Sequence, residues 1–262
     1  MHAPRSSPLT SDLPDIAADI FARLRARNPR VHCITNAVAQ NFTANVLLAT
    51  GAVPSMTVDP AEIAEFVARA DSLLVNLGTL NRDRREAAEI AIEQVSDERR
   101  PWVLDPVFVD RSEPRTALAK ALVAKKPWAI RLNGAEFAAL ADAVPEDDAL
   151  KQYVLEHLGV IALTGATDIV TDGARFAKIE NGDPLMGQVT AMGCVGAAVV
   201  AACLAVEADP WKATVAGLLG FTIAGECAAA CARGPGSFAV EIIDALAKLD
   251  RATFLARARV VT

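Results

Sequence analysis

The sequence lacks the features that mark nucleic-acid-binding and membrane-spanning proteins. Lys and Arg form no cluster and the formal net charge is −6, so nucleic acid is not an expected partner. No uninterrupted apolar stretch reaches about 18 residues, the length that a membrane-spanning helix needs. The longest candidate, residues 195–206, is too short, so a membrane partner is not expected either.

Three motifs of large enzyme classes are also absent. No Gly-x-x-x-x-Gly-Lys-[Ser/Thr] sequence occurs, which excludes a kinase of the P-loop type. No Gly-x-Gly-x-x-Gly opens a helix near the N-terminus, which argues against a dinucleotide-dependent dehydrogenase. No Gly-x-Ser-x-Gly occurs, which argues against a hydrolase with a nucleophile elbow.

The sequence also lacks the spacing of a histidine zinc site and the features of a signal peptide. The three histidines are well separated and give no zinc-binding spacing. The first residues lack the apolar core of a signal peptide, and residues 1–11 are predicted to be a flexible tail. Five cysteines in such a chain indicate reduced thiols in the cytoplasm. Cys203, Cys227 and Cys231 lie in Ala-rich helical sequence and are interpreted as small packing residues.

What the chain does contain is a regular alternation of apolar runs and amphipathic segments. Hydrophobic residues make up 52% of the 262 residues and aromatics 5%, a composition that favours helices packed on buried strands. Short apolar runs, predicted as strands, alternate with predicted helices of about 8–14 residues, which is typical of a parallel sheet covered on both faces. The strand runs are residues 31–35, 53–57, 72–77, 102–104, 128–132 and 160–163.

The pattern changes in the second half of the chain. Residues 169–171 and 175–179 flank Asp172-Gly173 and predict a β-hairpin, so antiparallel strands are expected at one edge of the sheet. From Cys194 onward the chain is predicted to be mostly helical. Neither an internal repeat nor a linker is visible, so residues 1–262 are predicted to form one α/β domain, a three-layer sandwich.

A turn of small residues before one of these helices is a candidate anion site. Residues 189–196 lead from a turn directly into an Ala- and Val-rich helix, where free backbone N–H groups and the positive helix end converge. A transferring phosphoryl group needs such a site, although from spacing alone a helix start that allows close packing is the favoured interpretation of the small residues. Cys194 lies at this helix start, where a thiolate is favoured, and is a candidate general base or simply a small structural residue.

Two acids follow the ends of predicted strands. Asp105 ends one strand, while Asn133 and Glu136 follow the next. Because ligands bind beyond the carboxyl ends of strands in open α/β sheets, these carboxylates are expected to converge and are candidate Mg²⁺ ligands. A turn or capping residue remains the alternative for Asp105, and a helix N-terminal acid for Glu136. Thr164-Gly165 offers a hydroxyl and a tight turn at the same edge.

Several stretches together resemble the hydroxyethylthiazole kinases. The resemblance is collinear from about residue 30 to residue 250, which makes it more specific than any one motif. It implies the ribokinase-like fold and ATP-dependent phosphorylation of 4-methyl-5-(2-hydroxyethyl)thiazole in thiamine synthesis or salvage. The stretches are Val31-His32-Cys33-Ile34-Thr35-Asn36, residues 41–48, residues 51–56, Asn76-Leu77-Gly78-Thr79-Leu80, Leu104-Asp105-Pro106-Val107, residues 170–173 and residues 234–238.

The resemblance also implies roles for individual residues. Asn36, Met56 and Ala191 are expected to contact the thiazole, and Arg131 and Thr164 to contact ATP. Asp105 and Glu136 are expected to help hold Mg²⁺, with Cys194 and Gly193 at the catalytic centre. Family members usually form trimers with the substrate pocket between subunits, which implies a homotrimer here.

Three positions depart from the family pattern, and all are expected near the active site. Ala191 replaces a glycine, residues 108–113 replace a Gly- and Ala-rich segment, and Leu132 replaces a glycine between Arg131 and Asn133. The departures leave open a kinase for a related alcohol such as hydroxymethylpyrimidine, or a catalytically silent protein that binds a thiazole or nucleotide. An altered or weakened kinase is the preferred hypothesis, since Asp105 and Cys194 remain.

Overall fold

The computed structural model describes residues 12–157 and 159–262. The predicted tail, residues 1–11, lies outside the described residues, as does Ser11, a possible cap of the first helix. The first described helix begins at Leu13, directly before Pro14. Proline is tolerated there because the first N–H groups of a helix have no partner inside it.

A nine-stranded sheet runs through the middle of the molecule in the order β2-β1-β3-β4-β5-β6-β7-β8-β9. The first six strands in that order pair in parallel, and β6 to β9 pair antiparallel. The strands are β1 (Arg30–Ile34), β2 (Val53–Ser55), β3 (Ser72–Asn76), β4 (Trp102–Asp105), β5 (Ala129–Asn133), β6 (Val160–Thr164), β7 (Asp168–Thr171), β8 (Phe176–Ile179) and β9 (Val260–Val261).

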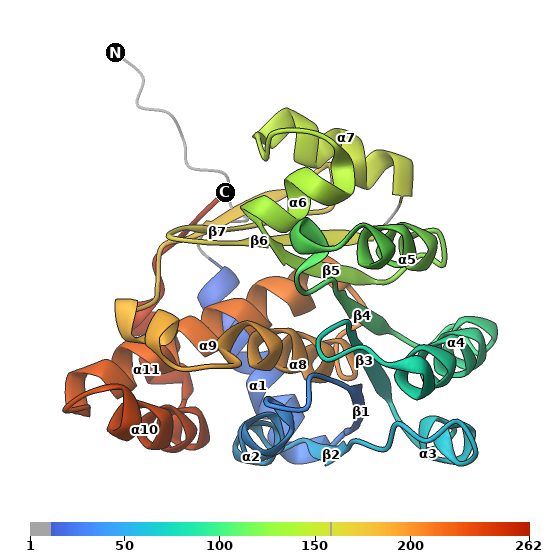
Figure 1. Ribbon diagram of the computed structural model, residues 1–262. Coiled ribbons are helices and arrows are strands. Elements are labelled where there is room, and N and C mark those ends of the chain that lie inside the picture. The colour runs from blue at the N-terminus through green and yellow to red at the C-terminus, as the bar shows by residue number, and fades with distance from the viewer. Residues whose placement is uncertain (1–11, 158) are drawn as a thin grey trace.

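Helices cover both faces of this sheet (Figure 1). One face carries α1 (Leu13–Arg27), α2 (Gln40–Thr50), α8 (Met192–Leu204), α9 (Pro210–Cys231), α10 (Pro235–Lys248) and α11 (Arg251–Arg257). The other carries α3 (Ile63–Val67), α4 (Arg82–Asp97), α5 (Glu113–Val123), α6 (Gly134–Ala141) and α7 (Asp147–His157). Two short 3₁₀ helices, η1 (Val109–Arg111) and η2 (Pro184–Gln188), lie in connecting loops.

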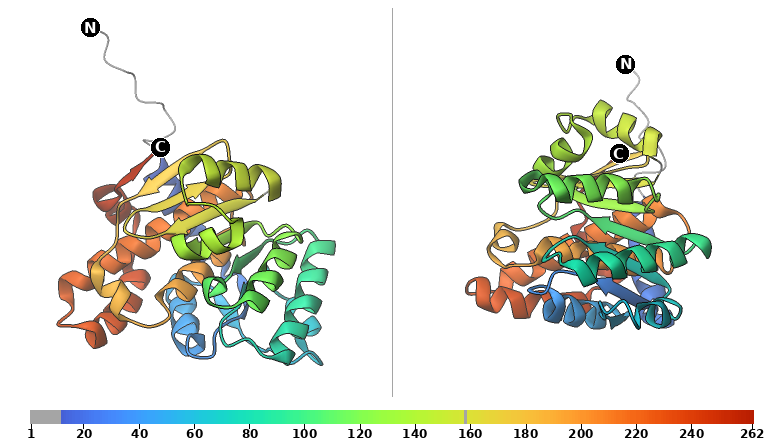
Figure 2. Two further views of the ribbon diagram at one scale, coloured as in Figure 1. Left: turned by 45° about the horizontal axis from the view of Figure 1, so that its top comes forward. Right: turned by 45° about the vertical axis from the view of Figure 1, so that its right-hand side comes forward.

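Alternating side chains of each buried strand fill two separate apolar cores. On β3, Leu74 packs among the residues of α1, α8 and α9, while Leu73 and Val75 pack among those of α3, α4 and α5. Successive side chains of a strand point to opposite faces, so each strand needs apolar residues at every position. Two further views show the resulting three layers from other sides (Figure 2).

The predicted α/β three-layer sandwich is therefore confirmed, and so are the hairpin of β7 and β8 and the antiparallel edge. Three elements were not predicted, namely α7, α11 and β9. The search for long apolar segments also missed α9, which is long and apolar enough to cross a membrane by length and composition. Its most apolar window is 72% buried inside the molecule, as expected for a core helix.

The connections place one crevice at the carboxyl end of the sheet. The chain leaves β1 toward β2 on one side and returns to β3 on the other, so the strand order reverses between β1 and β3. Ligands of open α/β sheets bind outside the carboxyl ends of strands at such a point. The residues that follow β1, β3, β4, β5 and β6 therefore meet along one edge.

Candidate functional site

A pocket of about 930 Å³ opens beside the carboxyl ends of β5 and β6. Its size is in the range of small-molecule and cofactor sites. The start of α8, the middle of α9 and the loop after β8 complete its walls. Of the predicted site residues, Arg131, Thr164, Ala191 and Gly193 line it.

The start of α8 brings free backbone groups into this pocket. Ala191 precedes the helix with a φ of +73° and makes no side-chain cap. The N–H groups of the first turn of a helix have no partner within it and carry its positive end. The segment predicted as an anion site therefore lies at a pocket, and the residue before its helix, Ala191, is a non-glycine residue with left-handed backbone.

Gly193 leaves room for the guanidinium of Arg131. A Cβ atom on Gly193 would lie 2.4 Å from Arg131 Nη1, closer than real contacts allow. The guanidinium therefore lies directly on the first turn of α8. Arg131 Nε is buried and has no hydrogen-bond partner among the described residues, and the residue lines the pocket, so its positive charge lies at the pocket wall.

Asp105 is the buried acid at the inner end of the site. Its Oδ2 accepts a hydrogen bond of 2.5 Å from Asn76 Nδ2, and its Oδ1 lies 3.9 Å from Arg131 Nη1. Within the described chain Oδ1 has no hydrogen-bond partner. Burial raises the pKa of Asp105 to about 7, and the Glu136 charge adds to the rise while Arg131 and the Asn76 hydrogen bond oppose it.

Burial opposes the thiolate form of Cys194 that the helix start favours. Burial and the charge of Asp105 raise the pKa of this thiol to about 12, against the opposing effects of Asn76 and Arg131. Desolvation of the charged form outweighs the helix N-terminus here. The side chain packs with Ala39, Val107 and Ala191, so it touches segments that follow both β1 and β4.

Glu136 makes the helix-capping contacts that were its alternative interpretation. With Asn133 it forms a capping box at the start of α6, and its Oε2 accepts from Asn133 N at 2.9 Å. Its Oε1 accepts from Phe108 N at 3.1 Å. Both oxygens are thus occupied, and the carboxylate fixes the loop that follows β4.

A magnesium ion fits this donor set through Asp105. Asp105 Oδ1 is a buried carboxylate oxygen with no hydrogen-bond donor in the described structure. Residues 12–157 and 159–262 contain no group of three or more His, Cys, Asp or Glu side chains placed to hold a metal. Magnesium is commonly held by one or two carboxylates together with substrate phosphates, so a complete protein cage is not required.

Asn36 and Met56 lie away from the pocket, on the side of β1 and β2. Each follows the carboxyl end of its strand, and neither lines the pocket. Asn36 lies over Gly78, where an added Cβ would be 2.5 Å from its Nδ2. Thr79 Oγ1 accepts from Ala37 N at 2.9 Å, so the loops after β1 and β3 are held together at the point where the strand order reverses.

Two polar residues of the site were not assigned a role from the sequence. Asn76 ends β3 opposite Asp105 on β4, and it shares a hydrogen bond with that carboxylate. Asp168 lines the pocket and accepts from Gly165 N at 3.0 Å. Burial raises the pKa of Asp168 to about 6, against the opposing Gly165 hydrogen bond and Arg131 charge. The pairing of Asn76 with Asp105 could have been found only from the register of β3 and β4.

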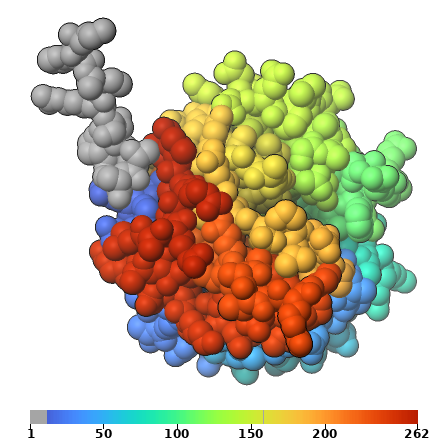
Figure 3. Space-filling view, turned by 90° about the vertical axis from the view of Figure 1, so that its left-hand side faces the viewer, coloured from blue at the N-terminus to red at the C-terminus, as the bar shows by residue number. Residues whose placement is uncertain are grey.

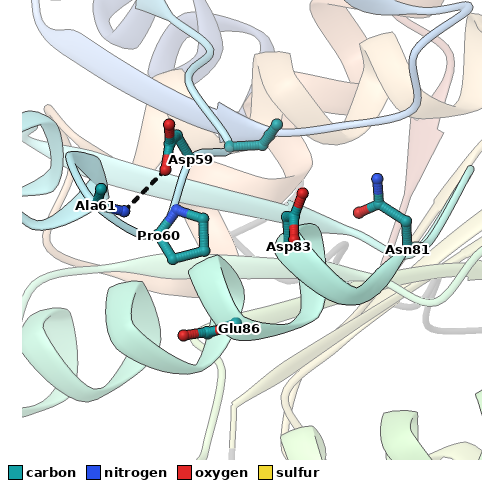
Figure 4. Close-up of a pocket in the computed structure, with 7 residues that line it drawn as sticks. Asp59, Pro60, Ala61, Asn81, Asp83 and Glu86 are labelled. Atoms are coloured by element: carbon teal, nitrogen blue, oxygen red, sulfur yellow. Dashed lines mark hydrogen bonds between the residues drawn. The ribbon is translucent and has the colours of Figure 1, made fainter.

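A second pocket, of about 620 Å³, lies on the side of α4 and contains none of the predicted site residues. Asp59, Asp83 and Glu86 supply its charges, and Figure 4 shows them around Pro60 with Asn81 at one end. Asp59 accepts from Ala61 N at 2.9 Å, a local turn contact. Because no basic side chain lines it, this pocket is a poor site for a phosphate.

Known proteins of similar sequence point to one family. The family model described as "Hydroxyethylthiazole kinase family" matches residues 21–252. The chain is 44% identical to hydroxyethylthiazole kinase of Clavibacter sepedonicus, with 93% of each chain covered. It is 42% identical to the enzyme of that name from Cronobacter sakazakii, which covers 88% of this chain and 92% of the relative.

Solved structures agree with the fold. The hydroxyethylthiazole kinase protein of Pyrococcus horikoshii is similar with a TM-score of 0.90 and 35% identity, over 94% of this chain and 98% of that one. A ribokinase-like superfamily protein from Enterococcus faecalis is similar with a TM-score of 0.68 and 12% identity, over 91% and 95% of the two chains. The second likeness shows the ribokinase-like fold alone.

Proposed function

The chain belongs to the hydroxyethylthiazole kinase family, and from that premise we propose that it transfers the γ-phosphoryl group of ATP to the hydroxyl of 4-methyl-5-(2-hydroxyethyl)thiazole. The observation that carries the proposal is the buried Asp105 Oδ1, which has no hydrogen-bond partner among the described residues and lies 3.9 Å from Nη1 of Arg131, a residue that lines the pocket. The product belongs to thiamine synthesis or salvage, and we place the enzyme in the cytoplasm.

ATP occupies the pocket beside β5 and β6. Arg131 and the N–H groups from Ala191 to Cys194 face the phosphates, and Thr164 offers its hydroxyl at the end of β6. The support is that the guanidinium of Arg131 and the N-terminus of α8 share one wall. Both favour negative charge, as a transferring phosphoryl group requires.

The thiazole binds on the other side of Cys194, with Asn36, Met56 and Ala191 as contacts. Asn36 lies against Gly78, close to the point between β1 and β3 where the strand order reverses. We propose that the protein is a homotrimer in which neighbouring subunits complete this half of the site. Support comes from the exposed apolar side chains of Val38 and Leu48 close by in the sequence.

Magnesium is proposed as the accompanying cation, with Asp105 as its protein ligand and Glu136 nearby. Glu136 holds Asn133 and the loop after β4 through its two oxygens. When bound, the ion neutralises phosphate charge. The chain's own contribution is the buried Asp105 carboxylate beside Arg131 and a loop that Glu136 holds in place.

The reaction is an in-line displacement. The substrate hydroxyl oxygen forms a bond to the γ-phosphorus, the bond to the bridging oxygen of ADP breaks, and the hydroxyl proton leaves. N–H groups at the start of α8 and the guanidinium of Arg131 stabilise the charge on the phosphoryl oxygens. Cys194 receives the proton as general base, which requires bound reactants to lower the high pKa of its thiol.

A competition experiment separates this proposal from its alternatives. Purified protein with Mg·ATP is given equal amounts of the thiazole alcohol and hydroxymethylpyrimidine, and each phosphate ester is quantified by mass spectrometry. Excess thiazole phosphate supports the proposal, and excess pyrimidine phosphate supports the related-alcohol kinase. Binding of both ligands by calorimetry without ADP release would support a silent binding protein.

A further inference from the structure

The loop that closes the nucleotide pocket is held by groups outside the pocket. This pocket loop comprises residues 180–189, most of which line the cavity, Asn181, Gly182 and Met186 among them. It follows β8 and reaches the turn before α8. Its position therefore sets the distance between the pocket wall and the phosphate-facing start of that helix.

Helix α9 contacts the pocket loop one turn beyond its own pocket residues. Leu218 and Thr222 line the cavity, and Gly225 and Glu226 follow on the same helix face because residues three and four apart are neighbours. A Cβ atom on Gly225 would lie 2.6 Å from Met186 Sδ, so the loop packs against the helix backbone there.

One carboxylate oxygen of Glu226 accepts three hydrogen bonds. Its Oε1 accepts from Gly182 N at 2.9 Å, from Asn181 Nδ2 at 3.1 Å and from Arg259 Nη2 at 2.6 Å. The side chain is 14% exposed, which strengthens these contacts relative to a surface ion pair.

The C-terminal segment completes the same network. Asn181 Oδ1 accepts from Arg259 N at 2.7 Å, and Asn181 Nδ2 also donates to Arg257 O at 2.8 Å. Arg259 Nη2 donates to Glu180 O at 2.6 Å, and β9 pairs with β8 directly before the loop. In Figure 3 the red C-terminal end lies against the gold segment that contains the loop.

We infer that Glu226 and Arg259 form a clamp that positions the pocket loop for nucleotide binding, so that α9 and the C-terminal strand set the affinity for ATP. Neither residue lines the pocket; they act through Asn181 and Gly182 as positioning residues. The inference rests on the proposed function in assigning ATP to this pocket. It predicts that the two residues influence nucleotide binding and leave the alcohol side unaffected.

The test compares two arginines of the C-terminal region. Arg259→Ala removes the clamp, whereas Arg251→Ala removes a similarly exposed arginine that pairs with Asp15 and Asp19 away from the pocket. Glu226→Ala removes the common acceptor, and Glu226→Gln returns a neutral acceptor. Each variant is checked for folding by circular dichroism and thermal melting. Binding of a non-hydrolysable ATP analogue is measured by calorimetry, and both KM values and kcat are measured in the coupled assay.

We expect Glu226→Ala and Arg259→Ala to raise the Kd of the analogue and the KM for ATP about tenfold, the effect of roughly one lost charged hydrogen bond. The KM for the thiazole and kcat stay within about twofold, Glu226→Gln recovers part of the loss, and Arg251→Ala matches wild type. Folded clamp variants with wild-type Kd, or an equal effect of Arg251→Ala, would overturn the inference.

Different results would contradict the proposed function and the inference about the clamp. If wild-type protein binds the analogue but phosphorylates no alcohol, the proposed function fails, and the Kd values still decide the clamp. If wild-type protein binds no ATP analogue, the assignment of nucleotide to this pocket is wrong and the inference falls with it.

Discussion

The two sides of the site differ in how completely one chain builds them. On the side of β5 and β6, the sheet edge, α8, α9 and the pocket loop enclose about 930 Å³. On the side of β1 and β2, Asn36 and Met56 follow their strands and line no such pocket. Val38, Leu48 and Val53 expose 64%, 59% and 45% of their surface there.

The difference between the two sides of the site has a physical explanation. Clustered exposed apolar side chains often mark an interaction surface, while the pocket proposed for the nucleotide is held by contacts within the chain, including those of Glu226 and Arg259. The pocket beside β5 and β6 is enclosed by residues of this chain, whereas the side proposed for the thiazole has no such pocket. Asp105 and Cys194 lie between the halves, so changes there should affect the reaction most.

The largest effect is expected from Asp105→Asn, which removes the negative charge at the junction. We expect kcat to fall about a thousandfold, the scale of losing one preorganised electrostatic group in a dry site, while the Kd of an ATP analogue without metal changes little. Steady-state kinetics and calorimetry measure the two. Asp59→Asn, in the acidic surface pocket, is the matched control with wild-type kinetics. Equal kcat values for both variants would contradict the role of Asp105.

Cys194 gives the second largest effect and sharpens the comparison, because it touches segments after both β1 and β4. Cys194→Ala should lower kcat about 10²–10⁴-fold if the side chain is the general base. Cys194→Asp should stay within about tenfold of wild type, since a carboxylate is an adequate base at this position. Single-turnover rates measure both variants. A loss in Cys194→Asp as deep as in Cys194→Ala counts against the base role.

A moderate effect is expected from pH. Burial raises the pKa of Asp105 to about 7 and of Asp168 to about 6. A raised pKa keeps each carboxyl protonated to higher pH, so the ionised free enzyme is lost as pH falls from about 8 to about 5. We expect kcat/KM for ATP to fall across this window, since it reports the free enzyme. A kcat/KM profile that is flat between about pH 6 and 8 would contradict this expectation. The pH profile of Asp168→Asn identifies the part of the fall that is due to the Asp168 carboxyl.

The smallest effect concerns the two family departures that adopt left-handed backbone. Ala191 has a φ of +73° and Phe108 a φ of +60°. Because a side chain costs roughly 1–2 kcal/mol in this region, Ala191→Gly and Phe108→Gly should each stabilise the fold by about 1 kcal/mol, or about 2–4 °C in Tm. Calorimetric melting measures this. Ala197→Gly, within α8, is the control and should destabilise; a lower Tm in all three variants contradicts the strain argument.

The fold was largely predictable from local patterns. Apolar runs such as Leu73 to Val75 are readable because strands buried on both faces need apolar residues throughout. Asp172-Gly173 predicted the hairpin through its turn chemistry. The two-residue strand β9 was not predictable, since only its pairing with β8 defines it, and α7 carries charged residues that obscure its apolar face.

The candidate site was predictable in part. Thr164 and Gly193 line the pocket at the end of a strand and the beginning of a helix, which sequence patterns reveal, whereas Arg131, inside β5, was expected only from the family resemblance. The partnership of Asn76 with Asp105 depends on the register of β3 and β4, which no local pattern encodes. The raised pKa of the Cys194 thiol was not predictable, because the sequence shows the helix start but not the depth of burial.

The most direct test of the account is the product of the reaction itself. Wild-type protein is incubated with Mg·ATP, with and without 4-methyl-5-(2-hydroxyethyl)thiazole, and ADP release is measured beside mass spectrometry of the alcohol. The account predicts thiazole-dependent ADP release with one phosphoryl group added to the alcohol for each ADP formed. Folded protein that releases no ADP above the control without alcohol, or ADP without the phosphate ester, would contradict it.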